Sequence, residues 1–128
     1  MTGAAASVDY NGIVLRDGIL VGLAGAALVF FSGPLAPVLG WPPESGIRVL
    51  GLVLALYGAG LARQARSMPQ DRRLPKSAAV VNLLFAAACP LVPLLAGAPM
   101  TAAGWAAAAL FALVAAGFAV AQLRVASR

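Results

Sequence analysis

The sequence lacks the residue types that most metal and redox sites need. It contains no histidine, which is the commonest general base and metal ligand among side chains. Its one cysteine, Cys89, cannot form an internal disulfide or a Cys-x-x-Cys redox pair. These absences exclude a Cys/His metal site and a thiol oxidoreductase, and we expect no cofactor.

Charged residues are also scarce. Only 10% of the 128 residues are charged and 62% are hydrophobic, and the mean hydropathy is +0.92. A soluble domain carries about a quarter charged residues. The composition therefore predicts a membrane protein, with residues 1–128 as a single transmembrane domain. The net charge of +5 does not indicate nucleic-acid binding, because the basic residues flank apolar segments instead of forming a basic stripe.

Four apolar runs cover residues 12–32, 46–63, 78–96 and 102–123. Each is close to the roughly 20 helical residues that cross the hydrocarbon of a bilayer. The predicted fold class is therefore all-α, a transmembrane four-helix bundle. The first run exceeds the apolar core of a signal peptide and opens with an acidic residue, so we expect it to be a retained span.

The basic residues fall almost entirely on one side of these spans. Eight of the nine lysines and arginines map to that side, and Arg48 alone maps to the other. By the positive-inside rule, the N-terminus, the C-terminus and the basic loop 63–77 are expected in the cytoplasm. Trp41 and Trp105 map to the opposite interface, where tryptophan commonly anchors a membrane protein.

A proline-rich segment follows the first span and recurs after the third. Four pairs match at a fixed offset of 56 residues: Pro34 with Pro90, Pro37 with Pro93, Pro43 with Pro99, and Ser45 with Thr101. We interpret the match as two duplicated helical hairpins; the alternative is shared turn chemistry in a low-complexity background. The hydroxyl residues are placed to cap the helices that follow. The prolines should kink or end the preceding helices, and an outward-facing vestibule between the hairpins would accommodate the freed carbonyl groups.

Small residues recur every four positions on three predicted helices. These residues are Gly18, Gly22 and Ala26 in the first, Gly51, Ala55 and Ala59 in the second, and Ala108, Ala112 and Ala116 in the fourth. Such spacing predicts close packing of helix backbones. The packing is expected within the molecule, and a seam between copies is the alternative.

Polar side chains inside the spans are the main candidate site residues. Asp17, Asn82 and Gln122 lie near the cytoplasmic ends of three spans, and Arg63 and Arg66 lie at a similar level. These five form a predicted intramembrane polar cluster. Our preferred interpretation is a structural clamp, in which Asp17 pairs with Arg63, Arg66 or another donor such as Asn82. The alternative is a proton or cation site at Asp17.

Three further residues carry specific expectations. Glu44 and Arg48 are four residues apart at the start of the second span, which predicts an outer-side charge pair. Arg48 could instead bind an anionic headgroup or substrate. Tyr57 lies mid-span and needs a partner for its hydroxyl group. Asp17 and Tyr57 are the candidates for acid–base catalysis, and no metal site is expected.

A pattern that extends over nearly the whole chain consists of four segments and one residue: Leu15-Arg16-Asp17-Gly18, Gly33-Pro34-Leu35-Ala36, Leu39-Gly40-Trp41-Pro42, Arg48-Val49-Leu50-Gly51, and Asn82 early in the third span. This pattern resembles a family of small four-span integral membrane proteins of high-GC bacteria, whose function is unknown. The resemblance implies a multi-pass protein of the bacterial inner (plasma) membrane. It brings no activity and no binding site.

Three classes of function remain open. Sparse polar content and small-residue faces favour a non-enzymatic packing or accessory module. The second class is a small-molecule or ion transporter that acts as an oligomer. The third is a membrane-embedded isomerase or cyclase for an apolar substrate, so the sequence does not decide whether the protein is an enzyme. Expected partners are membrane lipids and either further copies of the chain or a larger membrane complex, and not nucleic acid.

Overall fold

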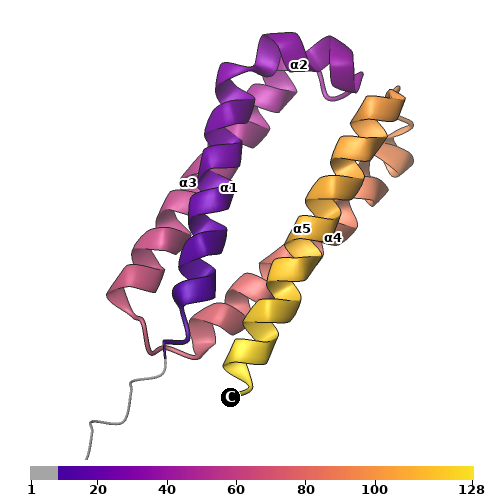
Figure 1. The fold of residues 1–128 in the computed structure, drawn as a ribbon. Helices are drawn as coiled ribbons and strands as arrows, with labels where there is room; N and C mark the ends of the chain where they lie inside the picture. The colour runs from indigo at the N-terminus through magenta and orange to yellow at the C-terminus, as the bar shows by residue number, and fades with distance from the viewer. Residues whose placement is uncertain (1–8) are drawn as a thin grey trace, which may run out of the picture.

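The computed structural model describes residues 9–128, and these residues form five helices and no strand (Figure 1). The helices are α1 (Gly12–Phe30), α2 (Ser32–Leu39), α3 (Glu44–Ser67), α4 (Arg73–Ala96) and α5 (Ala102–Ala126). All but α2 are long and apolar enough to cross a membrane. The predicted all-α four-helix bundle is confirmed. Residues 1–8, and with them the predicted cytoplasmic position of the N-terminus, lie outside the described part.

Three of the helices are longer than the apolar runs that predict them, and α5 exceeds its run by three residues, 124–126. Helix α3 covers residues 44–67 instead of 46–63, and α4 covers 73–96 instead of 78–96. Most of the added residues lie beside the α3–α4 loop and include arginine, glutamine and lysine, which form helices readily. Hydropathy detects the apolar part of a helix and misses the polar turns that continue it.

Helices α1 and α3 pack along a seam of small residues. A Cβ atom on Gly18 would lie 2.7 Å from the backbone nitrogen of Ala62 and 2.8 Å from the carbonyl oxygen of Gly58. A Cβ atom on Gly51 would lie 2.6 Å from the carbonyl oxygen of Gly25. The two backbones are therefore in direct contact, as small residues at four-residue spacing permit.

The predicted small-residue faces need correction in detail. Gly25 and Gly58 lie in the seam, whereas Ala59 is exposed. In α5 the buried small residues include Gly104, Ala115 and Ala119, while the predicted Ala108, Ala112 and Ala116 are only half-buried. Neighbouring residues point about 100° apart around a helix, so a sequence with small residues at adjacent positions does not reveal which of them face inward.

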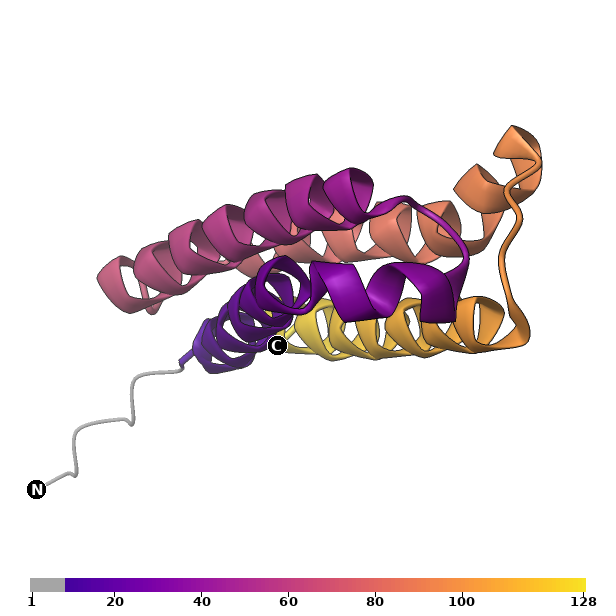
Figure 2. The same ribbon diagram turned by 90° about the horizontal axis from the view of Figure 1, so that it is seen from above.

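The helices form two antiparallel hairpins, α1 with α3 and α4 with α5 (Figure 1). Helix α2 continues from α1 and reaches across towards α5, as the view from above shows (Figure 2). Contacts within each hairpin are far more extensive than contacts between the hairpins. The arrangement of the two hairpins relative to each other therefore depends on a small number of interactions.

The prolines have different effects in the two hairpins. The helix end predicted before Pro34 is present, because α1 stops at Phe30 and α2 begins at Ser32. Helix α4 is assigned as one helix through Pro90 and Pro93, although Figure 2 shows its last turns bending away from the axis of the rest. A proline can thus either end a helix or only bend it.

The two predicted helix caps also differ. The Oγ1 atom of Thr101 accepts a hydrogen bond from the backbone N–H of Gly104 at 3.0 Å, so Thr101 caps α5 as predicted. The prediction for Ser45 is wrong, because α3 already begins at Glu44 and its N-cap residue is Pro43. Pro43 has extended backbone angles, φ −64° and ψ 166°, and its ring fixes φ near that value.

Candidate functional site

Three polar side chains from three helices meet inside the bundle. Asp17 of α1, Asn82 of α4 and Gln122 of α5 are 1%, 5% and 0% exposed. The side-chain amides of Asn82 and Gln122 each donate a hydrogen bond to Asp17 Oδ2, both at 2.7 Å. Asn82 Nδ2 also donates to Gln122 Oε1 at 3.0 Å. We call these three residues the polar clamp, because they join the first hairpin to both helices of the second.

Helix geometry explains how residues so distant in the sequence meet. Asp17 lies about 8 Å from the start of α1 and Gln122 about 6 Å from the end of α5, taking a rise of 1.5 Å per residue. Asn82 lies about 14 Å into α4, and its hydrogen bonds to Asp17 and Gln122 bring it to the same level. The three helices thus present their one interior polar residue at the same level.

The structure brings together three of the five residues of the predicted polar cluster. Arg63 and Arg66 are exposed, and Asp17 has no ion-pair partner within residues 9–128. The predicted pairing of Asp17 with these arginines is therefore not formed. Long arginine side chains near a helix end extend towards water, where their charge is hydrated. Asp17 Oδ1 is buried and has no hydrogen-bond partner in the described chain.

Tyr57 lies apart from the hydrogen bonds of the polar clamp. It is half-buried in α3 and packs against an apolar cluster that includes Val14, Leu61 and Leu74. Tyr57 therefore contributes to the packing of this cluster.

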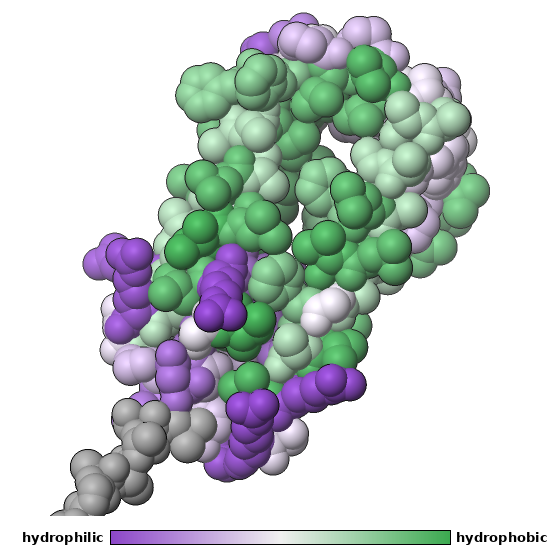
Figure 3. Space-filling view, in the orientation of Figure 1, coloured by the Kyte–Doolittle hydropathy of each residue, from purple (hydrophilic) through white to green (hydrophobic). Residues whose placement is uncertain are grey.

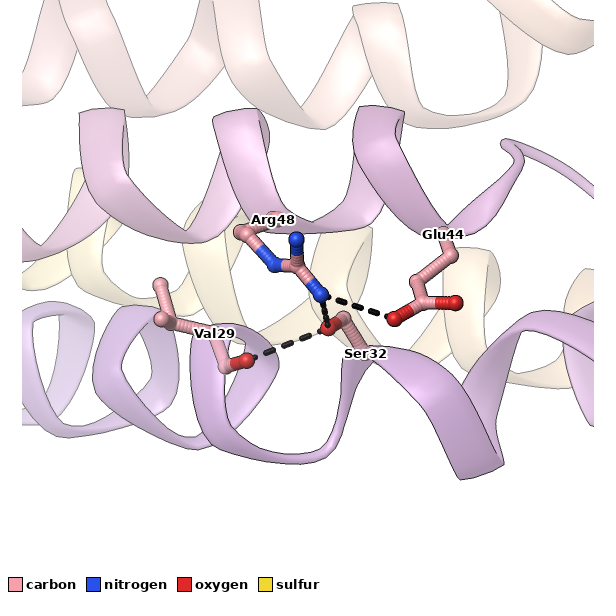
Figure 4. A network of polar contacts seen from close by, with 4 residues as sticks. All are labelled: Val29, Ser32, Glu44 and Arg48. Carbon is pink, nitrogen blue, oxygen red and sulfur yellow. Dashed lines mark hydrogen bonds and ion pairs between the residues drawn. The ribbon is translucent and has the colours of Figure 1, made fainter.

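The predicted outer-side charge pair is part of a small network at the α1–α2 junction (Figure 4). Arg48 Nη2 donates to Glu44 Oε1 at 2.7 Å and to Ser32 Oγ at 3.5 Å, and Ser32 Oγ donates to the carbonyl oxygen of Val29 at 3.1 Å. The side chains of Arg48 and Glu44 are 53% and 52% exposed, so the pair contributes at most about 1 kcal/mol to stability. The network links the start of α3 to the break that follows α1.

Thr101 joins the two hairpins at the end of the bundle that carries α2. Its Oγ1 donates to the carbonyl oxygen of Val38 at 2.5 Å, and its backbone N–H donates to the carbonyl oxygen of Leu39 at 3.1 Å. A Cβ atom on Gly104 would collide with the same Leu39 carbonyl group, so the first turn of α5 lies directly on the end of α2. We call the Thr101 contacts to α2 the α2 latch.

Between the polar clamp and the α2 latch, the hairpins enclose a partly open cavity of about 450 Å³. Figure 3 shows the hollow between the two hairpins, in the half of the molecule that carries α2. The lining is almost wholly apolar and includes Trp41, Ile47, Leu54, Phe85, Cys89 and Ala108. This cavity lies where the prolines predict a vestibule. Neither Asp17 nor Tyr57 lines it.

Sequence reasoning missed two residues at the opposite end. Asn11 is buried, and its Nδ2 donates to the carbonyl oxygen of Met68 in the α3–α4 connection. Arg72 Nη2 donates to the Tyr10 hydroxyl group and to the carbonyl oxygen of Arg128, both at 2.7 Å. An asparagine directly before an apolar run is a usable signal, although Asn11 lies outside the predicted spans. These contacts hold the start of α1, the α3–α4 loop and the end of α5 together.

The exterior of the bundle is that of a protein surrounded by lipid. Large hydrophobic side chains are exposed along the long helices; Leu56 of α3, Leu95 of α4 and Leu113 of α5 are 74%, 86% and 71% exposed. Hydrophilic residues gather at the end that carries the α3–α4 loop (Figure 3). Lipid can cover such a surface, because it solvates apolar side chains while the helices satisfy the backbone internally.

Comparison of the chain with protein-family models, with curated proteins and with solved structures gives no match. Within residues 9–128 there is also no group of three or more cysteine, aspartate or glutamate residues that could hold a metal ion. The chain is a small multi-pass membrane protein made of two helical hairpins, and its role must be inferred from the polar clamp and the cavity.

Proposed function

We propose that this chain is a non-enzymatic packing or accessory module that associates with further copies of itself or with a larger membrane complex. The observation that carries the proposal is the polar clamp. Asp17, Asn82 and Gln122 hydrogen-bond to one another across three helices. Polar side chains used in this way hold membrane helices together. The interior residues best suited to chemistry are therefore in a structural role.

The position of the cavity supports a non-enzymatic role. An isomerase or cyclase needs a general acid or base within hydrogen-bond distance of the bound substrate. The cavity is the place where an apolar substrate would fit, yet its lining contains neither Asp17 nor Tyr57. The two acid–base candidates, Asp17 and Tyr57, thus lie outside the space where an apolar substrate would fit.

We further propose that the end carrying the α3–α4 loop faces the cytoplasm of a bacterial cell. The described start of the chain, this loop and the C-terminus lie together at that end. Arg72 lies in this loop and Arg73 and Lys76 lie at the start of α4, and the positive-inside rule assigns all three to the cytoplasm. Membership of the high-GC bacterial family, suggested by the sequence pattern, would agree with an inner-membrane location.

The duplication of the two hairpins is likewise a proposal. It is supported by the proline matches at an offset of 56 residues and by the pairing of consecutive spans within each hairpin. The different ends of α1 and α4 would then reflect divergence of the two halves after duplication.

A transporter is the second candidate, and the cavity between the hairpins is the observation that favours it. If the protein is a transporter, an ion or small molecule should cross the membrane of proteoliposomes that contain the purified protein. Asp17→Asn should abolish that flux, whereas Asp71→Asn, a change in the α3–α4 loop, should leave it intact. Flux with this pattern would favour the transporter over the packing module.

The packing module is tested by the polypeptide mass of the particle that holds the chain in its own membrane. The protein is expressed at low level, extracted with surrounding lipid into polymer-bounded nanodiscs, and weighed by single-particle mass photometry. We expect a total polypeptide mass well above the 12.8 kDa of one chain. A particle that holds one copy and no other polypeptide would contradict the proposal.

A further inference from the structure

We propose that the cavity between the hairpins is a binding site for one acyl chain of a membrane phospholipid. The site lies between the polar clamp and the α2 latch and has a volume of about 450 Å³. The contacts that hold the cavity open, its lining and length, and the lipid outside it together indicate what occupies it.

The cavity is a fixed feature of the bundle, because the hairpins are joined on both sides of it. At one end, Asp17 receives hydrogen bonds from α4 and α5. At the other end, Thr101 binds the last carbonyl groups of α2. Between these contacts the second hairpin presents small side chains, including Ala88, Ala107 and Ala108. Protein interiors are normally close-packed, so a space held open in this way is filled from outside the chain.

The apolar lining of the cavity favours hydrocarbon over water. A buried water molecule needs two to four polar partners, and the cavity walls offer almost none. An apolar cavity of about 150 Å³ is known to stay dry and to take up an apolar molecule, and this cavity has about three times that volume. The ligand is therefore apolar where it contacts the protein.

The cavity is long enough along the helices to hold a segment of an acyl chain. Its lining extends from Gly46 to Leu54 along α3 and from Phe85 to Pro93 along α4, about 12 Å in each case at 1.5 Å per residue. This direction follows the helix axes, which is also the average direction of acyl chains in a bilayer. One chain can thus enter without leaving its normal orientation.

The surrounding membrane indicates where the acyl chain comes from. The cavity is partly open, and Figure 3 shows the hollow on the side of the molecule between the apolar surfaces of the hairpins. In the membrane this side faces phospholipid chains at very high local concentration, and a site in contact with so much ligand is occupied even if its affinity is low. No charged side chain lines the cavity, so we expect selection by the chain and not by the headgroup.

The test uses the fluorescence of Trp41, which lines the cavity. Trp105→Phe leaves Trp41 as the single tryptophan of the chain. This protein is reconstituted into nanodiscs of phosphatidylcholine with brominated acyl chains, which quench tryptophan on contact, and into matched nanodiscs without bromine. Ala108→Phe fills the cavity from α5, and Ala109→Phe is the control because Ala109 is exposed on the same helix and is not part of the lining.

We expect brominated lipid to quench Trp41, Ala108→Phe to remove most of that quenching, and Ala109→Phe to leave it unchanged. Equal quenching in the two variants, or none in the single-tryptophan protein, would overturn the proposal. If circular dichroism shows that Ala108→Phe does not fold, Ala88→Leu against the exposed Ala87→Leu repeats the comparison from α4.

Discussion

The seam between α1 and α3 allows one stability difference to be worked out from the structure. In Gly18→Ala the new methyl carbon would lie 2.7 Å from the backbone nitrogen of Ala62, whereas ordinary Cβ contacts begin at 3.4 Å. The helices must therefore separate by about 0.7 Å at this point, since a backbone atom cannot rotate away. Forcing an extra methyl group into a closely packed site typically costs about 1–3 kcal/mol.

Gly22→Ala is the matched control, one turn further along the same helix. Its Cβ atom would lie 3.8 Å from its nearest neighbour, which is ordinary contact. Both variants gain the same helix propensity from alanine, about 0.5–1 kcal/mol, so the difference between them isolates the collision. We expect Gly18→Ala to be less stable than Gly22→Ala by about 1–3 kcal/mol.

The difference is measured by reversible unfolding in mixed micelles of a mild detergent and SDS, followed by circular dichroism. If Gly18→Ala proves as stable as Gly22→Ala, the backbones of α1 and α3 are not in contact at Gly18 and the seam is placed wrongly.

Three further predictions use the same protein. Asp17→Asn keeps an acceptor for the Asn82 and Gln122 amides and should lose only about 0.6 kcal/mol of unfolding free energy, the average for polar contacts between membrane helices; an unfolding curve that shows a more stable variant would argue against the clamp. Thr101→Val removes the α5 cap and the side-chain bond of the α2 latch and should lose about 1 kcal/mol, whereas Thr101→Ser, which keeps the hydroxyl group, should stay close to the wild type. Reporter fusions at residue 128 and in the 66–76 loop should report the cytoplasm and a fusion near Pro43 the outside, and an exported C-terminus would reverse the proposed orientation.

The helical hairpins could be predicted because membranes impose simple rules on the chain. A span must be apolar over about 20 residues, and proline and glycine mark where it stops. These rules located four long helices and the break after α1. They gave no information on the polar first turns of α4, because an arginine- and lysine-containing segment can be either a loop or a helix that continues past the lipid.

The polar clamp was only partly predictable. The depths of Asp17, Asn82 and Gln122 in the membrane follow from their distances to the helix ends. The sequence therefore predicts that these three residues lie at a similar depth. The positive charges of Arg63 and Arg66 suggested them as partners for the Asp17 carboxylate. The depth of a residue in the membrane, however, does not show which way its side chain points. Both arginines lie on the exposed side of α3, where their guanidinium groups can stay hydrated.

The apolar lining of the cavity could not be predicted from the sequence. The proline pattern indicated a space between the hairpins, and freed carbonyl groups suggested that polar groups would line it. In the structure the lining of this space is almost wholly apolar. Which small residues of α5 face inward also depends on the angle at which the hairpins meet, and a single helix does not carry that information.

We infer that hydrogen bonds between Asp17 and the second hairpin hold the two halves of the bundle together. A double-mutant cycle tests it most directly, with Asp17→Leu, Gln122→Leu and the double variant unfolded under the same conditions. The structure places Gln122 Nε2 2.7 Å from Asp17 Oδ2, so the two changes should not be additive. We predict a coupling energy between about 0.6 and 1.7 kcal/mol, the average and the maximum measured for polar pairs in membranes. Additive effects, agreeing within about 0.3 kcal/mol, would show that the two side chains do not interact and would contradict the clamp.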